Sequence, residues 1–167
     1  MSVWLGVDPG AVSTGLALRN GRECLAWHTV KRADDETEIG PGPIYWAEIL
    51  RHIATFTGAS VRIAIEGVRP PSPFARERGK KTFASPIHPM ALAATFGAIY
   101  VTYPDAVVVP PGGNGSGYLA SYPEQLVTDA ERRHGLNREA GKGSKVSHAR
   151  SAWDVSVLAE RNARGAA

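Results

Sequence analysis

The chain has 167 residues, of which 43% are hydrophobic and 21% charged, a composition typical of one globular domain, residues 1–167, with its own core. Its single cysteine, Cys24, excludes an internal disulfide and a cysteine-based zinc cluster, so a bound metal would need oxygen or histidine ligands. The net charge is only +3, no apolar stretch is long enough to span a membrane and the start lacks a signal-like segment, so we expect a cytoplasmic protein.

A carboxylate follows the first apolar run of the chain. The run begins at Val3 and ends at Asp8, Pro9-Gly10 breaks it, and a second run begins at Thr14. This pattern predicts a buried strand, a turn and an antiparallel return strand. An ionised carboxylate at the end of a buried strand needs cations or several hydrogen-bond donors. Asp8 is therefore a candidate metal ligand, and the alternative is a turn aspartate bonded to its own backbone.

The elements that follow alternate between strand and helix patterns. In chain order we expect a hairpin turn at Asn20-Gly21, a strand at 24–30, a helix carrying Ile44, Ile49, Ile53 and Phe56, a strand at 61–68, a helix at 88–103, a strand at 106–109, a helix at 122–134 and an amphipathic helix at 147–160. The right-handed crossover rule places strand 61–68 parallel to the first strand.

Glu66 repeats the pattern of Asp8, because it also follows a buried run. Parallel neighbouring strands bring their carboxyl ends together, so Asp8 and Glu66 are expected within metal-sharing distance. The alternative makes Glu66 a solvated residue at a strand end. The matched pair favours the metal site.

The segment 69–86 has no periodicity and is rich in proline and basic residues. Long loops in compact domains are usually functional, and cations beside aromatic residues favour contact with phosphates and exposed bases. The candidate DNA contacts are Arg69, Phe74, Arg76, Arg78, Lys80 and Lys81 in this loop, and Lys142 and Lys145 in a second basic stretch. The alternative is an ordinary solvated loop.

Residues 110–117, the glycine-rich loop, follow the strand at 106–109. The loop lacks the Gly-Lys-Ser/Thr ending of a phosphate-binding loop, so we expect it to be a mobile rim of the active site instead. Further along, Asp154 lies inside the last helix at the margin of its buried stripe, with Ser151 one turn before it.

Three motifs together resemble the RuvC-type Holliday-junction resolvases of the ribonuclease H superfamily. They are Gly6-Val7-Asp8-Pro9-Gly10 with Thr14-Gly15, the acidic strand Ile63-Ala64-Ile65-Glu66, and the helix segment Ser151-Ala152-Trp153-Asp154-Val155. The resemblance implies an α/β, ribonuclease H-like fold, with a mixed five-stranded sheet flanked by helices.

The resemblance also implies a reaction, namely the hydrolysis of phosphodiesters in four-way junctions or related branched DNA. Asp8 would bridge two Mg²⁺ or Mn²⁺ ions, and Glu66 and Asp154 would each complete one site. The family usually carries Asp or His one turn before the last aspartate, where this chain has Ser151, with His148 three residues upstream. Either residue is a candidate further ligand. Arg69 stands where the family often has an aromatic residue, and Phe74 is the nearest substitute.

A homodimer would supply the two symmetric cuts that junction resolution needs. The candidate interface is the small-residue strip of the helix at 88–103, formed by Ala93, Ala94, Gly97, Ala98 and Val101, and the alternative is that this strip packs on its own sheet. Two other functions stay open. An actin-like or sugar-kinase ATPase would need a second lobe, and a non-catalytic or weakly active branched-DNA-binding protein would have the same fold.

Overall fold

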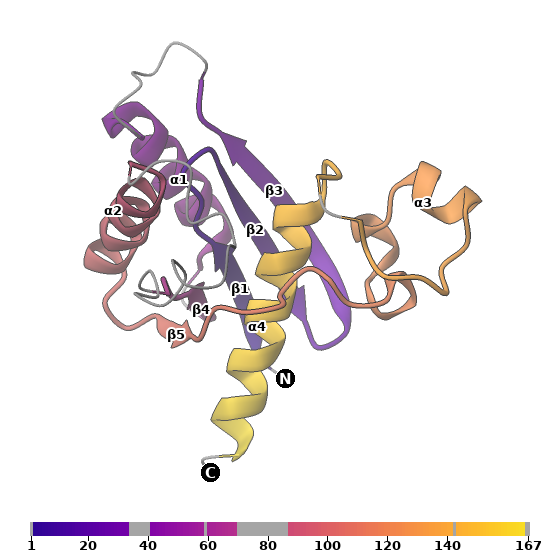
Figure 1. The fold of residues 1–167 in the computed structure, drawn as a ribbon. Coiled ribbons are helices and arrows are strands. Elements are labelled where there is room, and N and C mark those ends of the chain that lie inside the picture. Colours follow the sequence, from indigo (N-terminus) through magenta and orange to yellow (C-terminus); the bar gives the residue numbers. More distant parts are fainter. Residues whose placement is uncertain (1, 34–40, 59, 70–86, 142, 166–167) are drawn as a thin grey trace, which may run out of the picture.

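The computed structural model describes residues 2–33, 41–58, 60–69, 87–141 and 143–165. Within these residues five strands form one mixed sheet with the order β3-β2-β1-β4-β5 (Figure 1). The strands are β1 (Val3–Asp8), β2 (Ser13–Asn20), β3 (Glu23–Lys31), β4 (Val61–Glu66) and β5 (Val107–Val109). Helices cover both faces of the sheet (Figure 1), so the predicted mixed five-stranded sheet flanked by helices is confirmed.

The pairing of β1 places the two candidate carboxylates side by side at one edge of the sheet. β1 is antiparallel to β2, with Asp8 opposite Gly15. It is parallel to β4, with Val7 opposite Ile65, as the crossover rule predicted. Asp8 and Glu66 are the next residues of these two strands, and both therefore stand at carboxyl ends that meet.

The hairpin between β2 and β3 differs from the prediction by one residue. Asn20 pairs with Glu23, so the turn consists of Gly21 and Arg22 instead of Asn20 and Gly21. Gly21 has a φ of 59°, which is the first-position requirement of a type II′ turn. Asn20 is instead the last residue of β2.

One face of the sheet is covered by α1 (Pro43–Phe56) and α2 (Ile87–Thr102). Tyr45, Ile49 and Ile53 form the buried stripe of α1, whereas Ile44 is 74% exposed and does not belong to the core.

No helix in the described ranges combines the length and the apolar character that crossing a membrane requires.

The other face of the sheet is covered by α4 (Ser147–Gly165). Two glycines, Gly6 and Gly15, allow α4 to approach the sheet closely. A side chain at Gly6 would collide with the carbonyl oxygen of Ala152, and a side chain at Gly15 would collide with the carbonyl oxygen of His148. Because only glycine leaves this space, the start of α4 lies directly over the ends of β1 and β2.

The predicted helix at 122–134 is wrong. A short 3-10 helix, η2 (Leu119–Ser121), ends before the segment, and the segment itself contains a second 3-10 helix, η3 (Glu124–Leu126), and a short helix α3 (Asp129–Arg133). The backbone is extended at Val127, and Thr128 then starts α3 with a capping box, since its side chain accepts from the Glu131 N–H while Glu131 accepts from the Thr128 N–H.

A buried arginine joins this segment to α4. The Arg150 side chain is fully buried, and its guanidinium donates to Glu131 Oε1 at 2.9 Å, Ser144 Oγ at 2.6 Å and the Gly141 carbonyl at 3.1 Å. The guanidinium also lies 5.8 Å from the centre of the Tyr122 ring. The hydrogen bonds fix the guanidinium, and the guanidinium in turn contacts the Tyr122 ring.

Candidate functional site

Two carboxyl groups meet at the ends of β1 and β4. Asp8 is only 8% exposed, and its carboxyl is hydrogen-bonded to that of Glu66. Burial, followed by this hydrogen bond and the charge of Asp8, raises the pKa of Glu66 to about 7. In the metal-free protein Glu66 therefore tends to keep its proton.

His148, in the first turn of α4, is the third titratable group at this edge. Its Nδ1 lies 2.9 Å from Asp8 Oδ2, and its side chain is 44% exposed. The hydrogen bond to Asp8, opposed by burial and assisted by the charges of Asp8 and Glu66, raises the pKa of His148. His148 therefore connects α4 to Asp8 by a hydrogen bond.

The glycine-rich loop lies against Glu66, where the sequence placed the rim of the site. Asn114 donates its side-chain N–H to Glu66 Oε1 at 2.8 Å, and the Gly112 N–H reaches the same oxygen at 3.3 Å. The sequence analysis did not select Asn114. The available signal was topological, because the loop after β5 starts from the same edge at which β1 and β4 end.

Asp154 has a different set of partners. Its Oδ2 accepts from the Gly115 N–H and from the Tyr122 hydroxyl, each at 2.7 Å, while Oδ1 accepts no hydrogen bond from the described part of the chain. Burial raises the pKa of Asp154, and the donors Gly115 and Tyr122 oppose the shift. Tyr122 is a second residue that the sequence analysis missed.

The three acidic residues are not assembled as a group. No three His, Cys, Asp or Glu side chains in the described ranges are placed so that they could hold a metal ion together. The pair Asp8 and Glu66 does fit a cation by its chemistry, since two adjoining carboxylates are the oxygen ligands that Mg²⁺ and Mn²⁺ prefer and a cation would relieve their repulsion.

Ser151 lies at the site but, within the described residues, forms no hydrogen bond with Asp8 or Glu66. Its hydroxyl donates to the Asn114 carbonyl oxygen at 3.2 Å. A cavity of about 290 Å³ opens here, lined by Asp8, Asn114, Gly115, Ser116, Gly143, Ser147, His148 and Ser151. The cavity brings the end of β1, the glycine-rich loop and the start of α4 to one surface.

The predicted DNA contacts are only partly described. Arg69 follows the end of β4 and donates to the Pro111 carbonyl at 3.0 Å, and Lys145 is exposed two residues before Ser147 of the cavity. Phe74, Arg76, Arg78, Lys80, Lys81 and Lys142 lie outside the described residues.

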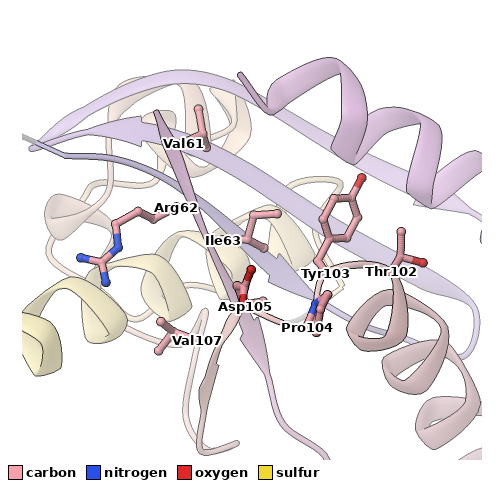
Figure 2. A pocket seen from close by; sticks show the side chains of 9 residues that line it. Val61, Arg62, Ile63, Thr102, Tyr103, Pro104, Asp105 and Val107 are labelled. Carbon is pink, nitrogen blue, oxygen red and sulfur yellow. The ribbon is translucent and has the colours of Figure 1, made fainter. Parts of the chain in front are cut away.

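A second hollow, of about 420 Å³, lies at the opposite end of β4 (Figure 2). It is lined by Val61, Arg62, Ile63, Thr102, Tyr103, Pro104, Asp105, Ala106 and Val107. Arg62 and Asp105 are its charged residues, and they come from the beginning of β4 and the segment before β5 (Figure 2). This hollow is separate from the carboxylate pair.

The sheet order, the two strand-end carboxylates and the helix α4 over β1 define a RuvC-like form of the ribonuclease H-like fold. The chain is similar to Thermus thermophilus RuvC in complex with a Holliday junction substrate, with a TM-score of 0.55 and 18% identity over 99% of this chain and 96% of that chain. A second T. thermophilus RuvC structure matches with a TM-score of 0.51 and 20% identity over 98% and 96%. No family model and no curated protein matches the sequence.

The raised pKa of Glu66 predicts a specific pH dependence of the metal-free protein. The folded state holds a proton on Glu66 up to about pH 7, whereas the unfolded chain loses it near the ordinary value of 4.5. Stability from this group is therefore lost as pH rises from about 4.5 to 7. In thermal unfolding with EDTA, wild-type protein should lose stability over this range relative to Glu66→Gln. Parallel curves for the two proteins would contradict the shift.

Proposed function

We propose that the protein is a metal-dependent endonuclease that resolves four-way (Holliday) junctions or related branched DNA by phosphodiester hydrolysis. The observation that carries the proposal is the contact of Asp8 with Glu66 at the ends of neighbouring parallel strands in a RuvC-like fold. The solved structure of T. thermophilus RuvC with a Holliday junction substrate supports branched DNA as the substrate class.

The proposed cofactors are two Mg²⁺ or Mn²⁺ ions. Asp8, Glu66 and Asp154 would hold them, and the Oδ1 atom of Asp154 accepts no hydrogen bond from the described part of the chain. When bound, such ions activate water and stabilise the leaving oxygen in an in-line displacement. Among the protein groups, His148 steadies Asp8 through Nδ1, and the Tyr122 hydroxyl and Gly115 N–H fix the plane of the Asp154 carboxylate.

A second candidate is a non-catalytic or weakly active protein that binds branched DNA. One observation favours it, namely that Asp154 is held by Tyr122 and Gly115 and no three-ligand group is assembled in the described ranges. Both candidates share the fold and the DNA class, and they differ in whether a strand is cut.

The carboxylates distinguish these candidates. Asp8→Asn, Glu66→Gln and Asp154→Asn should each lower Mg²⁺-dependent nicking of a labelled four-way junction by more than about 100-fold, because loss of groups that merely support a metal ligand already costs about 10–100-fold. Junction binding in Ca²⁺ should persist. Asp105→Asn, in the separate hollow, is the matched control. Binding without nicking by wild-type protein would establish the non-catalytic candidate.

The basic loop 69–86 is proposed to contact DNA phosphates beside the site. Its support is its composition and its departure from the Glu66 strand end, where Arg69 reaches the Pro111 carbonyl. Lys145 would extend the contact beside the cavity, since Gly143 and Ser147 line it, and Lys142 is proposed from the sequence alone.

Replacing Arg76 and Lys80 with Ala should weaken junction binding and flatten the plot of log affinity against log salt by roughly 1–2 units, because fewer counterions are released. The measurement is fluorescence anisotropy across a salt series. The control replaces Arg22 and Lys31, two exposed cations of β2–β3. An equal slope in wild-type and loop variant would place the phosphate contacts elsewhere.

The proposed working unit is a homodimer formed through α2. The sequence of this 16-residue helix contains no Asp, Glu, Lys or Arg, yet Met90 is 71% and Val101 82% exposed, and a side chain at Gly97 would meet no atom within 4 Å. Ala93 and Ala94 are exposed as well, whereas Gly97 and Ala98 are half-buried, so three of the five residues of the predicted strip are exposed. An uncharged exposed helix face of this kind fits a second copy of itself.

Val101→Glu should therefore shift the protein from dimer to monomer in light scattering, since it would bury two charges at the interface. Val157→Glu, at an exposed valine of α4, is the control. Wild-type protein that stays monomeric when bound to junction DNA would exclude the dimer.

A further inference from the structure

The glycine-rich loop connects Glu66 to α4 through contacts at both of its sides. On the Glu66 side, the Asn114 amide and the Gly112 N–H converge on Oε1 at 2.8 and 3.3 Å. Two donors on one oxygen restrict the rotation of the carboxylate more than a single donor would. The other side of the loop determines where these donors lie.

On the α4 side, three hydrogen bonds hold the same loop. The Ser151 hydroxyl donates to the Asn114 carbonyl at 3.2 Å, and the Gly115 N–H donates to Asp154 Oδ2 at 2.7 Å. The Gly117 N–H donates to the Tyr122 hydroxyl at 3.0 Å, and that hydroxyl donates to Asp154. The peptide group that joins Asn114 to Gly115 is therefore held at both its carbonyl oxygen and its N–H.

The loop also fits α4 too closely to shift without cost. Gly115 has a φ of 77°, and a side chain there would approach the Ser151 hydroxyl to 2.5 Å and the Ser147 carbonyl to 3.1 Å. Tyr122 is 7% exposed and lies beneath the buried Arg150 guanidinium. The anchors of the loop are thus themselves held by the core.

We propose that Asn114 is a positioning residue of the carboxylate site, which orients Glu66 for cation binding and is itself held in place by Ser151 and Asp154 of α4. This inference rests on the proposed function, since it takes Glu66 as a ligand. An amide suits the task because it donates a hydrogen bond to Glu66 without adding charge beside two carboxylates. Ser151 then acts on the site through Asn114 and is not a ligand.

The first test measures Mn²⁺ binding to the metal-free, full-length protein by electron paramagnetic resonance, without DNA. Asn114→Ala should weaken Mn²⁺ binding about 10- to 100-fold, the usual effect of removing a group that orients a ligand. Asn137→Ala, an exposed asparagine outside the loop, is the matched control. Circular dichroism melts establish that each variant folds. Wild-type affinity in Asn114→Ala would overturn the proposal.

A double-mutant cycle separates positioning from direct ligation by Ser151. Ser151→Ala should weaken Mn²⁺ binding in the wild-type background and add little in the Asn114→Ala background, because the hydroxyl acts only through the position of Asn114. Independent, additive losses would show that Ser151 affects the ion directly and would overturn its assigned role.

Amide hydrogen exchange of the metal-free protein gives a readout that does not depend on metal or activity. The Gly112 N–H shares Glu66 Oε1 with Asn114, so its exchange should accelerate in Asn114→Ala and in Ser151→Ala. Wild-type protein that binds no Mn²⁺ would end the proposed function, and the exchange rates would still decide the loop contact. If the exchange rate of the Gly112 N–H stayed unchanged in both variants, the positioning role of Asn114 would be overturned.

Discussion

The structure around the site depends on the contact between the carboxyl groups of Asp8 and Glu66. Two such groups at the ends of buried strands repel each other when both are ionised, and burial strengthens that repulsion. The surroundings compensate with donors: His148 at Asp8, and Asn114 and Gly112 at Glu66. The raised pKa of Glu66 favours a bound proton in the metal-free protein, and carboxylate oxygens are also the ligands that divalent cations such as Mg²⁺ prefer.

Helix α4 supplies the second layer of this arrangement. It reaches the strand ends because Gly6 and Gly15 leave no side chain between it and the sheet. The helix then presents His148 to Asp8, Ser151 to the glycine-rich loop and Asp154 to Gly115 and Tyr122. A single rigid element therefore connects both carboxylates of the pair, directly at Asp8 and through Asn114 at Glu66.

The sequence predictions succeeded where a local pattern and the tertiary environment agree. The strand runs that end at Asp8 and Glu66 carry their own burial signal, and the parallel pairing followed from the crossover rule. The predictions failed where packing overrides the pattern. The pattern of segment 122–134 predicts one helix, but the capping box at Thr128 starts a separate short helix, α3, at that residue. In α1, Tyr45 is buried where Ile44 was expected.

The sequence by itself determined the strand-end positions of Asp8 and Glu66 and the helix that carries Asp154, because hydrophobic periodicity acts over a few residues. The fold class followed from the resemblance of its three motifs to a known family. Only the tertiary structure decided the partners of these groups. Asn114 meets Glu66 across 48 residues of chain and Tyr122 meets Asp154 across 32. Contacts of that separation depend on how the sheet edge, the loop and α4 pack in space, and no local pattern encodes them.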